Sequence, residues 1–151
     1  MDTLNIRRFE EDDLQALYEL LSDEEVMRYI EPPYSFSQTE TFLQSAGLIL
    51  SLLIYVVETA NHDFVGYVIN QDYDAESKEI GWVLRRAFWG RGYAGTLTKQ
   101  LIEKAYAERK SVVLECSPTQ RGGLRWSSLS YKSIDRLLSP LKAVWMKPVQ
   151  L

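Results

Sequence analysis

The sequence has few of the residues that build disulfide bonds and metal sites. Its 151 residues include one cysteine, Cys116, and one histidine, His62. A single cysteine excludes an intramolecular disulfide and is typical of a reducing compartment. A structural zinc site needs a cluster of Cys and His ligands, so we expect no metal site. We expect Cys116 to be a small buried side chain rather than a nucleophile, and His62 to lie in a solvated turn.

Long hydrophobic runs are also missing. The longest apolar stretch, residues 46–57, is interrupted by Gly47 and Ser51. It is shorter than the roughly 20 apolar residues that span a bilayer. The first residues have neither the basic segment nor the apolar core of a signal peptide. We therefore expect a cytoplasmic protein that does not associate with a membrane.

Basic residues are in the minority. The chain has 17 Lys and Arg against 21 Asp and Glu, a net charge of −4, which argues against general nucleic-acid binding. The balance is uneven, −9 over residues 1–117 and +5 over residues 118–151. A basic surface facing an acidic one would explain this division. The length is that of one domain, so we expect residues 1–151 to form a single domain whose segment 118–151 is atypical.

Hydrophobic periodicity predicts a mixed α/β fold. An acidic first turn at residues 11–13 favours the first helix, and Ser37 with Glu40 has the spacing of a capping box. Short polar turns between the middle strands indicate an antiparallel meander. Strands are expected at residues 4–9, 52–58, 64–70, 79–84 and 112–116, and helices at residues 14–21, 24–29, 37–44 and 93–109.

The most informative segment is the six-residue sequence GRGYAG at residues 90–95. It lies between a predicted strand and a predicted helix. Glycines tolerate positive φ and leave backbone amides uncovered, and at a helix N-terminus such amides bind anions. A turn without a ligand would explain one glycine, but hardly three in six residues that also include Arg91. The segment therefore predicts a site for a phosphate group.

The same six residues spell the G-x-G-x-x-G fingerprint of dinucleotide-binding units. Glu115 follows Gly95 by twenty residues, as the fingerprint's acidic residue would. Two observations argue against a nicotinamide cofactor: five residues, 85–89, separate the strand from the first glycine, and antiparallel hairpins precede it. A Walker-type P-loop is excluded because no Gly-Lys-Ser/Thr follows.

From residue 4 to about residue 118 the sequence resembles the GCN5-related N-acetyltransferases, or GNAT family. The most specific part is EIGWVLRRAFWGRGYAGTLTKQLIEKA, residues 79–105. The family's loop is usually Arg/Gln-x-x-Gly-x-Gly/Ala, and here Trp89 stands at the first position. The W-G-x-G-Y-A form looks like the branch of ribosomal-protein N-terminal alanine/serine acetyltransferases. The resemblance implies a mixed central sheet with an antiparallel meander and helices on both faces.

The resemblance implies acetyl-CoA as the cofactor. In the family the strand before the loop splays at its end and exposes backbone groups to the pantetheine arm, and the loop amides hold the pyrophosphate. Of the strand's amides, that of Val83 is preferred for polarising the thioester carbonyl. Arg91 would add positive charge, as could Arg85 or Arg86. The implied cofactor-binding residues are Trp82, Val83, Leu84, Trp89, Gly90, Arg91, Gly92, Tyr93, Ala94 and Gly95.

The family moves the acetyl group directly from the thioester to a primary amine, of a protein N-terminus or a small molecule. An amine has a pKa of about 10, so a carboxylate is a suitable proton acceptor. By position Glu79 is the best candidate, although an exposed glutamate paired with Lys78 or an arginine would look the same. Glu115 is the second choice. Tyr131 is the available tyrosine for reprotonating the leaving thiolate.

The segment 118–151 departs from the family pattern, so residues of the acceptor pocket cannot be assigned from the resemblance. One hypothesis is that this segment is divergent, or the product of a shifted reading frame, and that its last strands pair with another subunit in a homodimer. A competing interpretation of the whole chain is a non-catalytic or inactive acyl-CoA-binding module.

Overall fold

A computed structural model describes residues 3–28, 31–49, 53–72, 75–116 and 144–148. Six strands form one sheet in the order β1-β2-β3-β4-β5-β6. The first four are antiparallel, whereas β4, β5 and β6 run parallel. The predicted mixed sheet with an antiparallel meander is confirmed. The strands are β1 (Leu4–Arg7), β2 (Ile54–Thr59), β3 (Phe64–Asp72), β4 (Ser77–Leu84), β5 (Ser111–Cys116) and β6 (Val144–Pro148).

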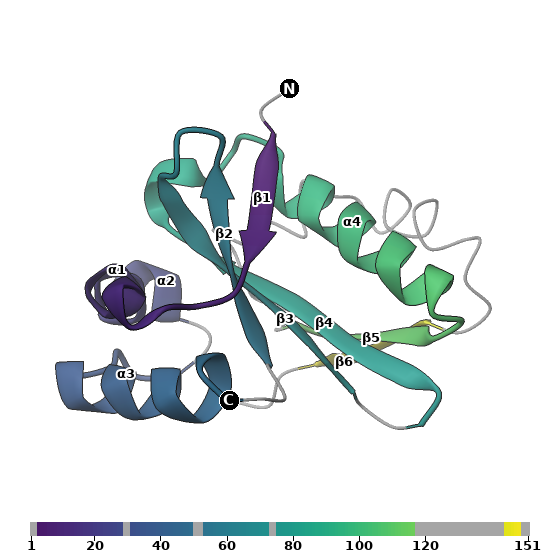
Figure 1. Cartoon of the computed structure of the whole chain (residues 1–151), viewed down its shortest axis with the longest axis horizontal. Helices are drawn as coiled ribbons and strands as arrows, with labels where there is room; N and C mark the ends of the chain where they lie inside the picture. The colour runs from purple at the N-terminus through teal and green to yellow at the C-terminus, as the bar shows by residue number, and fades with distance from the viewer. Residues whose placement is uncertain (1–2, 29–30, 50–52, 73–74, 117–143, 149–151) are drawn as a thin grey trace.

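Helices cover both faces of the sheet, as predicted. In Figure 1, α1 to α3 lie on one side of the strands and α4 lies on the other. Single 3-10 turns precede α1 and the glycine segment, and a π-helical turn follows α3. The helices are α1 (Leu14–Leu21), α2 (Glu24–Met27), α3 (Phe36–Phe42) and α4 (Tyr93–Ala107); the turns are Glu11–Asp13, Arg86–Phe88 and Leu43–Gly47.

Two hydrophobic cores result, because successive strand residues point to opposite faces. In β4, Val83 packs with the core of α1–α3, whereas Trp82 and Leu84 pack with the core of α4. Leu97 of α4 and Leu17 of α1 are fully buried in their respective cores. Burying a side chain of this kind stabilises the fold by roughly 1.5–3 kcal/mol. The sheet is therefore fixed from both sides, and β4 lies between the two cores.

The start of α3 differs from the prediction. Ser35, not Ser37, is the N-cap: its Oγ accepts a hydrogen bond from the Gln38 amide at 3.1 Å, and the Gln38 side chain accepts one from the Ser35 amide at 2.8 Å. This is a capping box two residues earlier than expected. Both serines fit the sequence pattern, but once the helix begins at Phe36 the later serine lies inside it.

An ion-pair cluster fastens β1 to its neighbours. Arg7 donates to both carboxylate oxygens of Asp13, at 2.9 and 2.8 Å, and to Glu58 at 2.9 Å. His62 adds a 3.0 Å hydrogen bond from Nδ1 to Glu58, and its φ of 67° confirms the predicted turn. The hydrogen bonds from Arg7 and His62 hold the pKa of Glu58 below its usual range. Burial alone would raise the pKa of Asp13, but the hydrogen bonds from Arg7 and the Glu10 amide outweigh it and lower that pKa.

Within the described ranges, none of the helices has the length and hydrophobicity needed to cross a membrane. The same residues contain no group of three or more His, Cys, Asp or Glu side chains placed to hold a metal ion.

Candidate active site

The site is built where β4 and β5 separate. The two strands pair from Ser77 with Ser111 to Ile80 with Leu114, where their register ends among the described residues. Strand β4 continues to Leu84 alongside β3, while β5 continues alongside β6. Among the described residues, no strand pairs with the last β4 residues on the side of β5, and we refer to this side as the opening. This is the splayed strand end that the sequence resemblance implied.

The hydrogen-bond register decides which β4 amides face that opening. The Arg85 amide donates to the Val65 carbonyl at 2.8 Å, and hydrogen-bonded pairs in an antiparallel ladder alternate with non-bonded ones. Val83, two residues earlier and opposite Tyr67, therefore directs its backbone groups toward β3. A Cβ at Gly66 would collide with the Val83 carbonyl oxygen, which confirms that this carbonyl points toward β3.

The preference for the Val83 amide is therefore wrong. The residues on either side, Trp82 and Leu84, direct their backbone groups to the side of β4 on which β5 lies, and so toward the opening. The sequence of β4 alone does not show which of its amides hydrogen-bond to β3. That depends on the register between the two strands, which the connecting turn sets.

The glycine segment forms a cradle at the start of α4. Gly90 and Gly92 have φ values of 78° and 80°, the left-handed region that favours glycine. Among the described residues, nothing lies within 4 Å of a Cβ built at either position. Gly92 is the N-cap of α4, whose first turn carries no acidic residue and no side-chain cap. An open, uncapped helix N-terminus suits an anion, so these residues fit a pyrophosphate.

Aromatic side chains hold the cradle in place. The indole Nε1 of Trp89 donates to the Leu84 carbonyl at 2.9 Å. Tyr93, 5% exposed, stacks on Phe88 with ring centroids 6.0 Å apart. The Arg91 guanidinium lies 5.2 Å from the centroid of the same Phe88 ring. Arg91, the cation predicted for this loop, is thus oriented by a cation–π contact.

The other two candidate cations already have partners. Arg85 contacts Glu19 of α1 at 3.2 Å, and Arg86 contacts Asp23, the N-cap of α2, at 2.8 Å. The charge of each guanidinium is therefore engaged by a carboxylate of this chain. These pairs join the segment before the cradle to the helices on the opposite face, a connection that local sequence patterns cannot reveal.

Glu79 lies beside the point where the strands separate. It pairs in register with Gln71 of β3 and Val113 of β5, one residue before the last β4–β5 pair. Its side chain is half-buried and accepts a hydrogen bond from the Gln71 amide group. By alternation from Val83 it lies on the face of α1–α3, opposite α4. Glu79 is not the ion-pair partner of Lys78, because the Lys78 ammonium contacts Asp72 at 2.9 Å.

The described structure does not test the roles of the remaining predicted residues. Tyr131 lies outside the described residues, as does most of the segment on which the homodimer prediction rests. Glu115 pairs with Lys147 of β6, beyond the point where β5 leaves β4, and Cys116 pairs with Pro148. Gln71 was missed by sequence reasoning; its position opposite Glu79 could be found only from the hairpin register.

Comparison with known proteins decides between the cofactor alternatives. Residues 3–125 match the family model of the acetyltransferase (GNAT) domain. The chain belongs to the GNAT acetyltransferase family. Acetyl-CoA is the acetyl donor in this family, so the cofactor prediction is confirmed and the nicotinamide alternative is wrong. The antiparallel strands before the cradle agree, since a doubly wound dinucleotide fold would need parallel ones.

Individual proteins are also similar to this chain. YnaD of Bacillus subtilis (strain 168), an uncharacterized N-acetyltransferase, is 29% identical over 119 residues, which are 76% of this chain and 70% of that protein. A GNAT-family acetyltransferase from Bacillus anthracis shares the fold, with a TM-score of 0.74 at 24% identity over 91% of this chain and 82% of that chain.

A spermidine N-acetyltransferase from Vibrio cholerae, solved in complex with CoA and spermine, has a TM-score of 0.59 at 26% identity. The alignment covers 69% of this chain and 64% of the Vibrio chain, so the chain matches less than two thirds of that protein.

Proposed function

We propose that this GNAT acetyltransferase is an N-acetyltransferase that acetylates a primary amine. The observation that carries the proposal is the cradle of Gly90 and Gly92, placed at the N-terminus of α4 and beside the end of β4 that leaves β5. Acetyl-CoA supplies the acetyl group as a thioester, which the amine attacks directly.

The cradle would bind the pyrophosphate of the cofactor. The amides of residues 90–95 and the positive end of the α4 dipole favour an anion, and Arg91 adds a full positive charge nearby. Trp89 and Tyr93 fix the cradle through the contacts with Leu84 and Phe88. The role of these side chains is to keep the amides oriented before the cofactor arrives, which lowers the entropy cost of binding.

The end of β4 would orient the acetyl group. Trp82 and Leu84 direct their backbone groups toward the opening, so an amide of one of these residues is the donor that we assign to the thioester carbonyl. A fixed amide in a position shielded from water stabilises the negative charge that develops on a carbonyl oxygen. The Leu84 carbonyl accepts the hydrogen bond from the Trp89 indole.

Glu79 would take the proton of the attacking ammonium. It is half-buried at the point where the strands separate, and the hydrogen bond from Gln71 fixes one of its carboxylate oxygens. A carboxylate held in one orientation can accept a proton directly or through one water molecule. We keep Tyr131 as the candidate general acid on the resemblance alone.

Two acceptor classes follow from the relatives. The W-G-x-G-Y-A form of the loop resembles ribosomal-protein N-terminal acetyltransferases, whereas the Vibrio relative is a spermidine N-acetyltransferase. The acceptor that we propose is accordingly the amine of a protein N-terminus or of a small molecule. The single cysteine is consistent with the reducing environment of the cytoplasm, where both acceptors occur.

The test has two stages, both on the full chain. Calorimetry with acetyl-CoA measures cofactor binding, and a thiol-release assay then measures turnover against a panel of N-terminal peptides and polyamines. We expect saturable binding and release of CoA with at least one amine. Binding without turnover on any amine would favour a non-catalytic acyl-CoA-binding module. Failure to bind acetyl-CoA would contradict the assignment of the cradle as well.

A further inference from the structure

A cavity lies on the α4 face of the sheet, separate from the cradle. Its volume is about 490 Å³, and it is formed by β1, β2, β3 and the second half of α4. Cavities of 300–1,000 Å³ are typical of small-molecule sites. Gln100 and Lys104 contribute to its wall, roughly 10 and 16 Å along the helix from Tyr93. None of residues 90–95 contributes to its lining.

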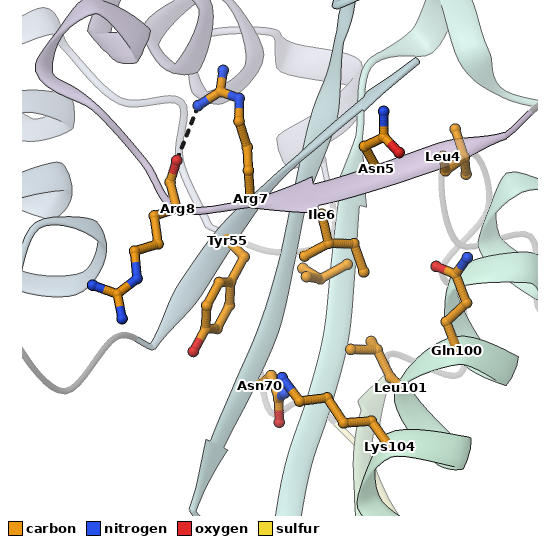
Figure 2. Close-up of a pocket in the computed structure, with 11 residues that line it drawn as sticks. Leu4, Asn5, Ile6, Arg7, Arg8, Tyr55, Asn70, Gln100, Leu101 and Lys104 are labelled. Atoms are coloured by element: carbon orange, nitrogen blue, oxygen red, sulfur yellow. Dashed lines mark hydrogen bonds between the residues drawn. The ribbon is translucent and has the colours of Figure 1, made fainter. Parts of the chain in front are cut away.

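The floor of this cavity is apolar. Figure 2 shows Ile6 of β1 and Leu101 of α4 facing each other across it, with Leu4 at one end. Ile6 is 39% exposed, so a ligand in the cavity could remove part of its surface from water.

The charged groups of the lining are all basic. No described residue that lines the cavity is acidic, although residues 1–117 carry an excess of nine negative charges. Arg7 is neutralised by Asp13 and Glu58 on the other face of β1. Arg8 also lines the cavity, and no salt bridge joins either Arg8 or Lys104 to a carboxylate within the described residues. Lys104 reaches the cavity from α4. Its ammonium lies 5.7 Å from the centroid of the Tyr55 ring.

A neutral polar side chain, that of Asn70, stands beside this ammonium. Figure 2 shows Lys104 extending from α4 toward the strands, on the side of the cavity where Asn70 lies, with Gln100 one turn earlier on the helix. Asn70 and Tyr55 both project from the face of the sheet that α4 covers, because they share the parity of Val68. A carboxylate placed there would meet one cation and the side-chain amide of Asn70, and charge-assisted hydrogen bonds of this kind are the strong ones.

We propose that this cavity binds a small organic anion with an apolar body, of the class of short-chain carboxylic acids. Its carboxylate would accept hydrogen bonds from Lys104 and from the side-chain amide of Asn70. Its hydrocarbon part would cover Ile6 and Leu101. The site is distinct from the acetyl-CoA cradle, and it does not depend on whether the chain acetylates an amine.

The test is an amide chemical-shift titration of the ¹⁵N-labelled full chain with sodium hexanoate, without acetyl-CoA or acceptor. We expect saturable shifts at the amides of Ile6 and Lys104 and at the side-chain amide of Asn70. Hexan-1-ol, which has the same chain but no charge, should bind at least fivefold more weakly. Shifts that do not saturate, or that centre on residues 90–95, would overturn the proposal.

A matched pair of lysine variants on α4 tests the role of the cation. Lys104→Gln should weaken hexanoate binding at least fivefold. Lys99→Gln, an exposed lysine on the same helix that does not line the cavity, should bind as the parent protein does. Both changes are on the helix surface, so both proteins should fold. Equal affinity of the two variants would contradict the proposal, whatever the outcome of the acetyl-CoA experiments.

Discussion

The indole nitrogen of Trp89 donates a 2.9 Å hydrogen bond to the carbonyl oxygen of Leu84. This bond closes the five-residue segment between the end of β4 and the first glycine of the cradle. Trp89 stands at the position where the family usually has Arg or Gln, and its indole contacts both hydrophobic cores. The cradle is therefore tied to the strand that we assign to the acetyl group, and the two halves of the site are held at a fixed separation.

Replacing Trp89 with Phe removes the hydrogen-bond donor and keeps an aromatic ring. We expect the free energy of unfolding to fall by about 1 kcal/mol, the usual net value of one hydrogen bond. Acetyl-CoA should bind about 3- to 10-fold more weakly, because the cradle is no longer fixed to β4. Urea unfolding and calorimetry measure the two effects. A variant that binds acetyl-CoA as tightly as the parent protein would show that the bond has no part in holding the cradle.

Two glycines in neighbouring strands test the position of the end of β4. A Cβ at Gly66 would collide with the Val83 carbonyl and lie 2.9 Å from the Leu84 Cα, whereas one at Gly81 would make an ordinary 3.4 Å contact with Ile69. We expect Gly66→Ala to destabilise the fold by about 1–3 kcal/mol and to lower the rate of acetyl transfer. Gly81→Ala should change stability by less than about 0.5 kcal/mol. If urea unfolding shows that Gly66→Ala and Gly81→Ala destabilise the protein equally, the β3–β4 register is contradicted.

Replacing Glu79 with a side chain that cannot accept a proton tests its role as the general base. Glu79→Gln keeps the size of the side chain and a hydrogen-bond partner for Gln71. We expect kcat to fall by on the order of 10²-fold, as for other general bases, with the Kd of acetyl-CoA unchanged.

Glu103→Gln is the matched control for this experiment, since Glu103 is an exposed carboxylate on α4 away from the site. Its kcat should equal that of the parent protein. If Glu79→Gln also retains full activity, Glu79 is a structural partner of Gln71, and the proton acceptor is another group.

The Arg7 cluster gives stability a defined dependence on pH. Glu58 and Asp13 have lowered pKa values in the folded state, so they stabilise the fold above the ordinary carboxyl range near pH 4. This contribution is lost as the pH falls through their folded pKa values. Arg7→Met should cost about 2–3 kcal/mol at pH 7, less than a fully buried pair because Arg7 is 34% exposed.

The same variant should show a flatter loss of stability in acid than the parent protein, because Arg7 then no longer lowers the pKa of either carboxylate. Urea unfolding between pH 7 and about pH 3 measures this slope. Arg8→Met is the control, since the Arg8 side chain is exposed and donates no hydrogen bond to either carboxylate. Parallel curves for the parent protein and Arg7→Met would contradict the assignment.

Local patterns predicted the elements of the fold well. The β-branched runs of β2 and β3, the apolar stripe of α1 and the glycines before α4 each carry a local physical signal. Relations between distant residues were not predictable in this way. The pairing of Gln71 with Glu79 and the direction of the Val83 amide depend on the register of a hairpin. The ion pairs of Arg85 and Arg86 with α1 and α2 depend on packing across the sheet.

The central claim is that the cradle at Gly90 and Gly92 binds the pyrophosphate of acetyl-CoA. Gly92→Val tests it most directly, by calorimetry with acetyl-CoA. Its φ of 80° disfavours valine, and the added side chain would stand in the open space before the cradle. We predict at least a tenfold loss of affinity in a protein whose circular dichroism spectrum is unchanged. Parent-like affinity in a folded Gly92→Val protein would show that the cofactor is held elsewhere.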